Sequence, residues 1–244
     1  MLILAVDTST RMGSVAILLD SQVLAQVSGY EETPYSNRLF RDIAVLLDQV
    51  NFRLNQVDVF AVSAGPGSFT GLRIGLTAVK AWAEVHQKPI AAVSGLQAIA
   101  VNSLAGQPPG AAAAEFIAPF LDARRGQVFG AIYRRITEGN NAESSSLVLD
   151  SEESILSPDE FQQMVKGRSS QTITLVSPTP DVLPAAWLAE ALPGTHVVQV
   201  SAVLAPAIGL LGLERARRGE LVEAILLDAN YIRRPDAEAA WKDG

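Results

Sequence analysis

The sequence predicts an α/β protein of two similar lobes, each with a mixed β-sheet covered by helices. Its 244 residues, 48% hydrophobic and 18% charged, suffice for one large domain or two small lobes with a buried core. Strand-like runs come first and helical spacing follows, and this order occurs in both halves. Between the halves, Gly106–Gly110 followed by four alanines is typical of a linker.

The residue pattern of the first half predicts three strands followed by alternating helices and strands. This order is typical of a ribonuclease-H-like lobe. The helix from Asn37 to Val50 has two adjacent apolar rows, an arc wide enough to contact more than one neighbour. The expected strands are Leu2–Val6, Ser14–Leu19, Val23–Val27, Val57–Ala64 and Ile90–Val93, and the expected helices are Asn37–Val50, Phe69–Val85 and Ser94–Leu104.

The second half repeats the order without repeating the residues. Ser157-Pro158-Asp159-Glu160 predicts a helix start with proline in the first turn. The expected strands are Glu115–Leu121, Gln127–Arg134, Ser146–Leu149, Thr172–Val176 and Val197–Val200, with helices near Leu183–Ala191 and Ala202–Arg218. We therefore predict a first lobe over residues 1–106, a second over 107–219 and a tail over 220–244.

Composition excludes several classes of protein. A formal net charge of -7 and a pI of about 4.9 make the whole chain a poor binder of polyanions. The chain has no cysteine, so it has no disulfides and no thiolate ligands, which fits the cytoplasm. No apolar run is long enough to span a membrane. Arginine pairs such as Arg124-Arg125 and Arg233-Arg234 are either scattered surface charges or a local basic patch.

Two segments combine hydroxyls or glycines with a strand end. Asp7-Thr8-Ser9-Thr10 is either a phosphate-cradling turn or a hydrogen-bonded turn that closes a hairpin. In the stretch from Gly65 to Gly75, Gly65 and Gly67 permit converging backbone N–H groups, and Ser68 is placed to cap the next helix. A degenerate phosphate loop is therefore expected from Asp7, Thr8, Ser9, Gly65, Gly67 and Ser68.

The helix after Ser68 carries small residues on one face. An interior glycine costs about 0.5–1 kcal/mol relative to alanine, which is tolerated where another backbone approaches closely. This face either packs on the protein's own sheet or docks a partner. The predicted docking surface, shared with the Asn37–Val50 helix, consists of Leu39, Phe40, Ile43, Leu47, Gly71, Gly75, Ala78 and Trp82.

Four segments together resemble the bacterial TsaB (YeaZ) family, whose members have been labelled glycoprotease-like or peptidase M22 proteins. They are Leu4–Ser9, Gly65–Gly75, Leu121–Phe129 and Tyr231–Arg234. The resemblance spans nearly the whole chain and implies an actin-like (ASKHA) fold. It also implies a role in forming threonylcarbamoyladenosine at position 37 of tRNAs that read codons starting with A. In that system TsaD is the transferase, TsaB its non-catalytic partner and TsaE an associated ATPase.

An uncovered apolar face on the two helices of the docking surface would pair two copies of the chain about a two-fold axis. The resemblance implies that the same surface binds TsaD, so homodimer and heterodimer should compete. We expect no metal, because a TsaD-like HxxxH pair is missing and the two histidines, His86 and His196, lie far apart. We expect no cofactor and at most weak nucleotide binding, because Pro178 and Pro180 stiffen the turn where a nucleotide-binding relative has paired glycines. Tyr35 stands where many relatives have a histidine. An ATP-dependent kinase or ATPase of this fold is the alternative, and a metalloprotease lacks its ligands.

Two further expectations concern surfaces. The arginines Arg124, Arg125, Arg233 and Arg234 are candidates for a basic patch, since guanidinium groups bind phosphates through paired hydrogen bonds. Contact with tRNA through such a patch is expected only within the assembled complex. No contact with a membrane is expected.

Overall fold

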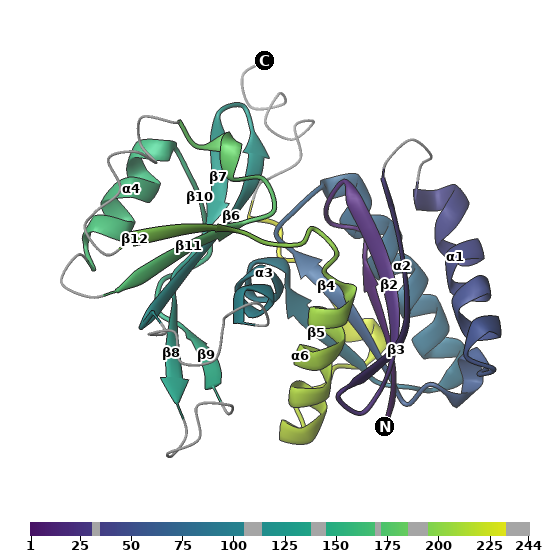
Figure 1. Ribbon diagram of the computed structural model, residues 1–244. Helices are drawn as coiled ribbons and strands as arrows, with labels where there is room; N and C mark the ends of the chain where they lie inside the picture. Colours follow the sequence, from purple (N-terminus) through teal and green to yellow (C-terminus); the bar gives the residue numbers. More distant parts are fainter. Residues whose placement is uncertain (31–34, 105–113, 138–144, 169–171, 185–194, 233–244) are drawn as a thin grey trace. The chain divides into compact units, whose positions relative to one another are not determined.

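The computed structural model describes residues 1–30, 35–104, 114–137, 145–168, 172–184 and 195–232. The chain forms two compact units (Figure 1). The first contains Met1–Ala98 and the described residues from Ala202 onward, and the second contains Ile99–Ser201. No helix among the described residues is long and apolar enough to cross a membrane.

The first unit is built on a five-stranded sheet in the order β3-β2-β1-β4-β5. Strands β1, β2 and β3 form an antiparallel meander, whereas β4 and β5 run parallel to β1, so the predicted mixed sheet is present. All six residues of β1 are buried, as expected of a strand covered on both faces. The bounds are β1 Leu2–Asp7, β2 Met12–Leu19, β3 Gln22–Tyr30, β4 Val59–Gly65 and β5 Ile90–Ser94.

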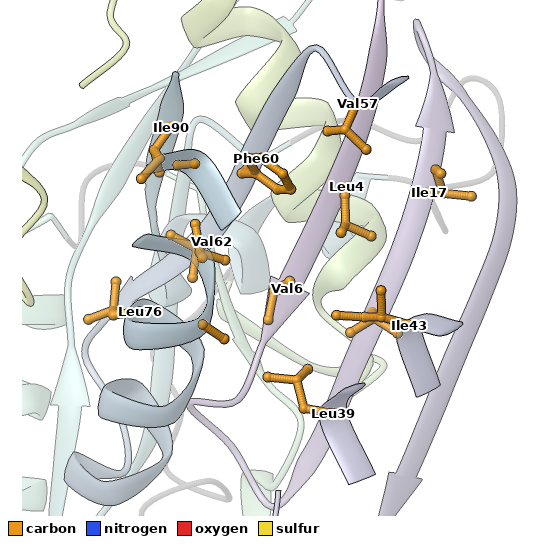
Figure 2. Packing of buried hydrophobic residues seen from close by; sticks show 14 of the residues in the cluster. Leu4, Val6, Ile17, Leu39, Ile43, Val57, Phe60, Val62, Leu76 and Ile90 are labelled. Atoms are coloured by element: carbon orange, nitrogen blue, oxygen red, sulfur yellow. The ribbon is translucent and has the colours of Figure 1, made fainter. Parts of the chain in front are cut away.

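Helices cover both faces of this sheet. Helices α1 (Tyr35–Gln49) and α2 (Phe69–His86) lie on one face, and α6 (Ala205–Arg218) lies on the other (Figure 1). Alternate side chains divide between the two layers. Those facing α1 and α2 form the main core, which Figure 2 shows, and it includes Leu4, Val6, Ile17, Leu39, Ile43, Phe60, Val62 and Leu76. Short 3₁₀ turns lie at Leu54–Gln56 and Ala224–Leu226.

Helix α6 belongs to the first unit, so the structure divides the chain differently from the predicted ranges 107–219 and 220–244. A Cβ on Gly209 or Gly212 would overlap Leu18 of β2 or Ala61 of β4, so these glycines let α6 lie close against the sheet. The segment after α6 also stays with this unit. Val222 pairs with Ile90 of β5, and Leu227 is buried in the core.

The second unit contains a seven-stranded sheet with the path β10-β7-β6-β11-β12, from which β8 and β9 branch. Strands β11 and β12 run parallel to β6, and the other pairs are antiparallel. The bounds are β6 Phe116–Arg124, β7 Gln127–Gly130, β8 Tyr133–Thr137, β9 Ser145–Leu149, β10 Ser154–Leu156, β11 Ile173–Ser177 and β12 Thr195–Gln199. Helix α3 (Gly95–Leu104) connects the two units, and a 3₁₀ turn spans Pro180–Val182.

Helix α4 (Pro158–Lys166) begins where the sequence predicts. Ser157 and Glu160 form a capping box, with Pro158 in the first turn. Phe161 is fully buried and packs against Phe120 of β6 with ring centroids 5.5 Å apart. The short strand β10 was not predicted, and the predicted helix near Leu183–Ala191 lies almost entirely outside the described residues.

Candidate functional site

The turn after β1 is closed by its own side chains. Asp7 is fully buried, and its Oδ1 accepts hydrogen bonds from the backbone N–H of Ser9 at 2.9 Å and from the Ser9 hydroxyl at 2.6 Å. Burial raises the pKa of Asp7 to about 6, although the hydrogen bonds from Ser9 and Thr10 act in the opposite direction. Of the two interpretations of this segment, the hydrogen-bonded turn describes the structure.

The donors of a phosphate loop are used inside the protein. The Ser68 N–H donates to Ser9 O at 2.8 Å, and the Thr8 hydroxyl donates to Gly71 O at 2.7 Å. Ser14 Oγ accepts from the N–H of Ala205 at the start of α6. The arrangement does not favour a phosphate group, because the Thr8 hydroxyl, both donors of Ser9 and the Ser68 N–H already have protein acceptors.

The glycines of α2 pack against this turn and not against a partner. A Cβ on Gly71 would overlap the carbonyl oxygen of Thr8, and one on Gly75 would overlap the Thr8 hydroxyl. A Cβ on Gly67 would lie 2.5 Å from Ser9 O. Ala78 is also buried. The prediction that Gly71, Gly75 and Ala78 form a docking face is therefore wrong, because the turn after β1 occupies the space in front of both glycines.

The last described residues cross the N-terminal end of α2. The Asn230 N–H donates to Ala64 O at the end of β4, and a Cβ on Gly65, whose φ is +118°, would lie 2.7 Å from Asn230 O. The ring of Tyr231 lies 5.0 Å from that of Phe69, and its hydroxyl accepts from Arg73 Nε. Ser68 caps the helix through Gly71 N, as predicted. Glycine at position 65 therefore leaves the space through which this C-terminal segment passes.

The predicted docking residues of α1 separate into two groups. Leu39 and Ile43 are buried in the core, so they were wrongly assigned to the docking surface. Phe40 is 59% exposed and meets the edge of Trp82 at a centroid distance of 5.6 Å, and the Trp82 ring in turn lies 6.2 Å from that of Phe60. Leu47, two helical turns further along the same face, is half-buried.

An exposed apolar patch therefore remains on α1 and α2. We define the α1–α2 patch as Phe40, Ala44, Leu47, Trp82 and Val85, of which Val85 is 75% exposed. An open depression of about 730 Å³ adjoins it and shares two of its residues. The depression is lined by Ala44, Leu47, Asp48, Asn51, Phe52, Arg53, Asn55 and Gln56. Apolar patches of this kind commonly mark protein interaction sites.

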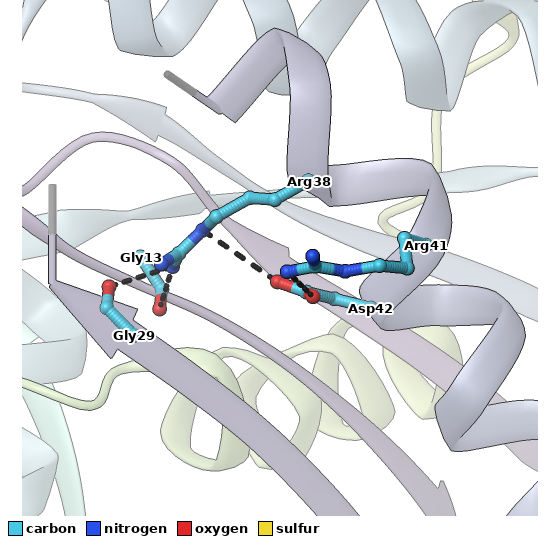
Figure 3. Close-up of polar contacts among 5 residues, drawn as sticks. All are labelled: Gly13, Gly29, Arg38, Arg41 and Asp42. Carbon is cyan, nitrogen blue, oxygen red and sulfur yellow. Dashed lines mark hydrogen bonds and ion pairs between the residues drawn. The ribbon is translucent and has the colours of Figure 1, made fainter. Parts of the chain in front are cut away.

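A buried arginine, which the sequence analysis missed, fixes α1 on the sheet (Figure 3). Arg38 is 7% exposed and donates through Nη2 to Gly29 O at 2.6 Å and to Gly13 O at 3.1 Å. Its Nε lies 3.5 Å from Asp42 one turn later. A Cβ on Gly29 would overlap the Arg38 guanidinium. The hydrogen bonds from Arg38 to Gly13 and Gly29 hold the start of α1 against β2 and β3 and so position the α1–α2 patch.

The predicted basic patch is described only in part. Arg124 and Arg125 lie at the tip of the β6–β7 hairpin in the second unit, and both are exposed. Arg233 and Arg234 lie outside the described residues.

At the end of β11, Ser177 Oγ accepts from the N–H of Thr179, which closes the turn between Pro178 and Pro180.

The remaining positions singled out in the sequence are Tyr35 and the two histidines. The side chain of Tyr35 and that of His196 lie outside the described residues. His86 is half-buried in the last turn of α2. Among the described residues, no group of three or more His, Asp or Glu side chains is placed to hold a metal ion.

Comparison with known proteins identifies relatives. The family described as "TsaD: tRNA N6-adenosine threonylcarbamoyltransferase" matches residues 32–176, more than half of the chain. The "tRNA threonylcarbamoyladenosine biosynthesis protein TsaB" of Bacillus subtilis is 36% identical over 134 residues, 55% of this chain and 56% of that protein. The Escherichia coli protein of the same description is 32% identical over 141 residues, 57% of this chain and 58% of that protein. The chain thus spans about half the length of the curated relatives it matches.

Solved structures match over nearly the whole chain. YeaZ from Pseudomonas aeruginosa superposes with a TM-score of 0.71 at 27% identity and covers 94% of this chain and 99% of that chain. A second Pseudomonas aeruginosa structure, described as similar to peptidase YEAZ, gives 0.74 at 26% identity, with coverage of 95% and 99%. The ROK hexokinase from Thermus thermophilus, at 10% identity and a TM-score of 0.50, shares the fold alone over 88% of this chain and 100% of that chain. The predicted α/β actin-like fold with mixed sheets is confirmed. The chain belongs to the family described for TsaD, and the relatives and solved structures reported above to which it is similar are TsaB and YeaZ proteins.

Proposed function

We propose that this chain is a non-catalytic partner and activator of TsaD in the formation of N6-threonylcarbamoyladenosine at position 37 of tRNAs that read codons starting with A. The curated relatives are described as biosynthesis proteins for this nucleoside, which supports the pathway. The observation that carries the partner role is the α1–α2 patch, in which the exposed Phe40 packs on the half-buried Trp82 beside a depression. Aromatic residues dominate the binding energy of many protein interfaces.

The state of the phosphate-like turn supports a role without catalysis. A kinase or ATPase needs donors aimed at a phosphate, whereas here the donors at Ser9, Thr8 and Ser68 have protein acceptors. We therefore propose that ATP binds weakly if at all, and that no cofactor or metal is required. Isothermal titration with ATP tests this part. A low-micromolar Kd that is lost in Asp7→Ala would favour the kinase alternative.

The partners follow from the same proposal. TsaD occupies the α1–α2 patch in the complex, and a second copy of this chain occupies it in isolation, so the two assemblies compete. TsaE joins the complex, and tRNA is contacted only within it. The absence of cysteine fits a cytoplasmic setting, where thiols stay reduced.

A charge at the centre of the α1–α2 patch tests the docking role. Phe40→Glu should weaken both homodimerisation and TsaD binding by about 30-fold or more, the loss expected for a hot-spot aromatic. Val45→Glu is the matched control, since Val45 is 55% exposed on the same helix but lies about 140° around it from Phe40. Light scattering measures the dimer and calorimetry measures TsaD binding. If Phe40→Glu binds TsaD as well as Val45→Glu does, the interface lies elsewhere.

A further inference from the structure

The β6–β7 hairpin turns through three successive residues with left-handed backbone. Arg124 has φ 64°, Arg125 has φ 56° and Gly126 has φ 71°. This region of backbone space normally belongs to glycine, asparagine and aspartate, because a larger L side chain places its Cβ too close to the neighbouring carbonyl. Two-residue hairpin turns of this kind favour Asn-Gly. Arginine at two consecutive left-handed positions is therefore strained and serves no need of the turn itself.

A bulge in the ladder accompanies the turn. Asp122 pairs with Val128 and Arg124 pairs with Gln127, so one extra residue, Ala123, is accommodated on the β6 side. Bulges of this kind redirect the side chains that follow them. A Cβ on Gly126 would have no other atom within 4 Å, and Arg124, Arg125 and Gly126 are all exposed.

Asp122 supports the turn. Its Oδ1 accepts from the Arg124 N–H at 2.7 Å, which holds the left-handed backbone, and its Oδ2 lies 3.3 Å from Arg124 Nη1. The Arg124 side chain remains 57% exposed, so the ion pair leaves most of its guanidinium facing solvent. A guanidinium has five N–H donors in a planar fork that matches the oxygens of a phosphate.

We propose that the tip of the β6–β7 hairpin binds a phosphodiester of an RNA backbone through Arg124 and Arg125. Residues held in unfavourable backbone conformations cluster at functional sites, and here they carry two adjacent, exposed positive charges. The choice of tRNA as the RNA rests on the function proposed above. The attraction is local, since the chain as a whole has a net charge of -7.

Salt-dependent RNA binding tests the site. The probe is an unmodified transcript of a tRNA that reads codons starting with A, titrated with the full chain assembled with TsaD. Arg124→Asn/Arg125→Asn removes both charges and supplies a residue suited to left-handed backbone. Arg217→Gln/Arg218→Gln is the control, because it removes two charges from exposed positions at the end of α6.

The hairpin variant should bind the transcript about 10-fold or more weakly at low salt. Its plot of log affinity against log salt should be shallower by about 0.7, the value for one lost contact to a single-stranded phosphate. Its Tm should stay the same or rise by about 2–4 °C as the strain is relieved. Asp122→Asn, which keeps the Oδ1 acceptor and removes the negative charge, should tighten binding.

Three results would overturn the site: a hairpin variant with the salt slope of the wild type, a control variant that loses the same slope, or a wild-type assembly that binds no RNA. The proposed function is judged separately by TsaD binding, which the hairpin variant should retain. If the chain does not bind TsaD at all, the partner role fails, and the slope measured on the chain alone decides the hairpin site.

Discussion

Replacing Asp7 with asparagine should stabilise this protein at neutral pH. The Asp7 carboxyl is fully buried at the end of β1, and burial raises its pKa from 3.8 to about 6. Above pH 6 the folded protein therefore holds a buried charge that the unfolded chain would place in water. A rise of this size corresponds to a cost of about 3 kcal/mol at pH 7. Asparagine avoids the cost and keeps an oxygen to accept from Ser9.

The stabilisation by Asp7→Asn should depend on pH. Between about pH 4 and pH 6 the folded state binds more protons than the unfolded state at this group, so its contribution to stability falls as the pH rises. Below pH 4 the carboxyl is protonated in both states and the cost vanishes. The advantage of Asp7→Asn should therefore approach 3 kcal/mol at pH 7.5, about 6–12 °C in Tm, and shrink toward zero near pH 4.

Urea unfolding at pH 7.5 and at pH 4 measures the effect. Asp58→Asn is the matched control, since the Asp58 carboxylate accepts a backbone hydrogen bond from Leu2 N but is exposed. It should change stability by less than about 0.5 kcal/mol at either pH. An Asp7→Asn protein that is less stable than the wild type at pH 7.5, or equally stabilised at both pH values, would refute the argument from burial.

Three further predictions follow from the site. Gly71→Ala should destabilise the protein by about 1–3 kcal/mol in urea unfolding, because its Cβ meets the backbone of Thr8, whereas Thr77→Ala on the exposed side of α2 should have little effect. Arg38→Met should cost about 3 kcal/mol, because it leaves the carbonyl groups of Gly13 and Gly29 without their donor and leaves Asp42 with Arg41 as its remaining arginine partner. Unfolding at the wild-type urea concentration would show that Arg38 does not hold α1 on the sheet. Elemental analysis of the purified protein should find no stoichiometric zinc or iron, and one equivalent of either would overturn the ligand argument.

Local patterns in the sequence predicted most of the elements correctly. The helix spacing, the cap at Ser68 and the helix start at Ser157-Pro158 depend on neighbours within a few residues, and the structure contains all three features. The mixed order of strands in the first unit also follows from the order of elements along the chain.

The errors concern contacts between residues far apart in sequence. Nothing local to Gly71 or Gly75 indicates that Thr8, more than sixty residues earlier, lies against them. The same holds for α6, whose close packing on the first sheet depends on Gly209 and Gly212 meeting Leu18 and Ala61. Small residues reveal that something approaches closely, but not whether it is the protein's own backbone or a partner's.

Arg38 could have been suspected from its position. It stands beside Leu39 on a helix whose apolar arc is wide, and a cation there needs acceptors. Those acceptors are carbonyl groups of Gly13 and Gly29, which only the hairpin of β2 and β3 brings together. The left-handed backbone at Arg124 was likewise invisible, because the sequence shows arginine where the turn would favour asparagine or glycine.

Reconstituted tRNA modification measures whether this chain activates TsaD through the α1–α2 patch. Threonylcarbamoyladenosine formed on an unmodified transcript would be measured with TsaD alone, with TsaD and this chain, and with TsaD and the Phe40→Glu or Val45→Glu variant, with the other components of the reaction held constant. Product should depend on this chain, persist with Val45→Glu and be lost with Phe40→Glu. Product at the full rate without this chain, or with Phe40→Glu in its place, would show that the chain does not activate TsaD through this surface.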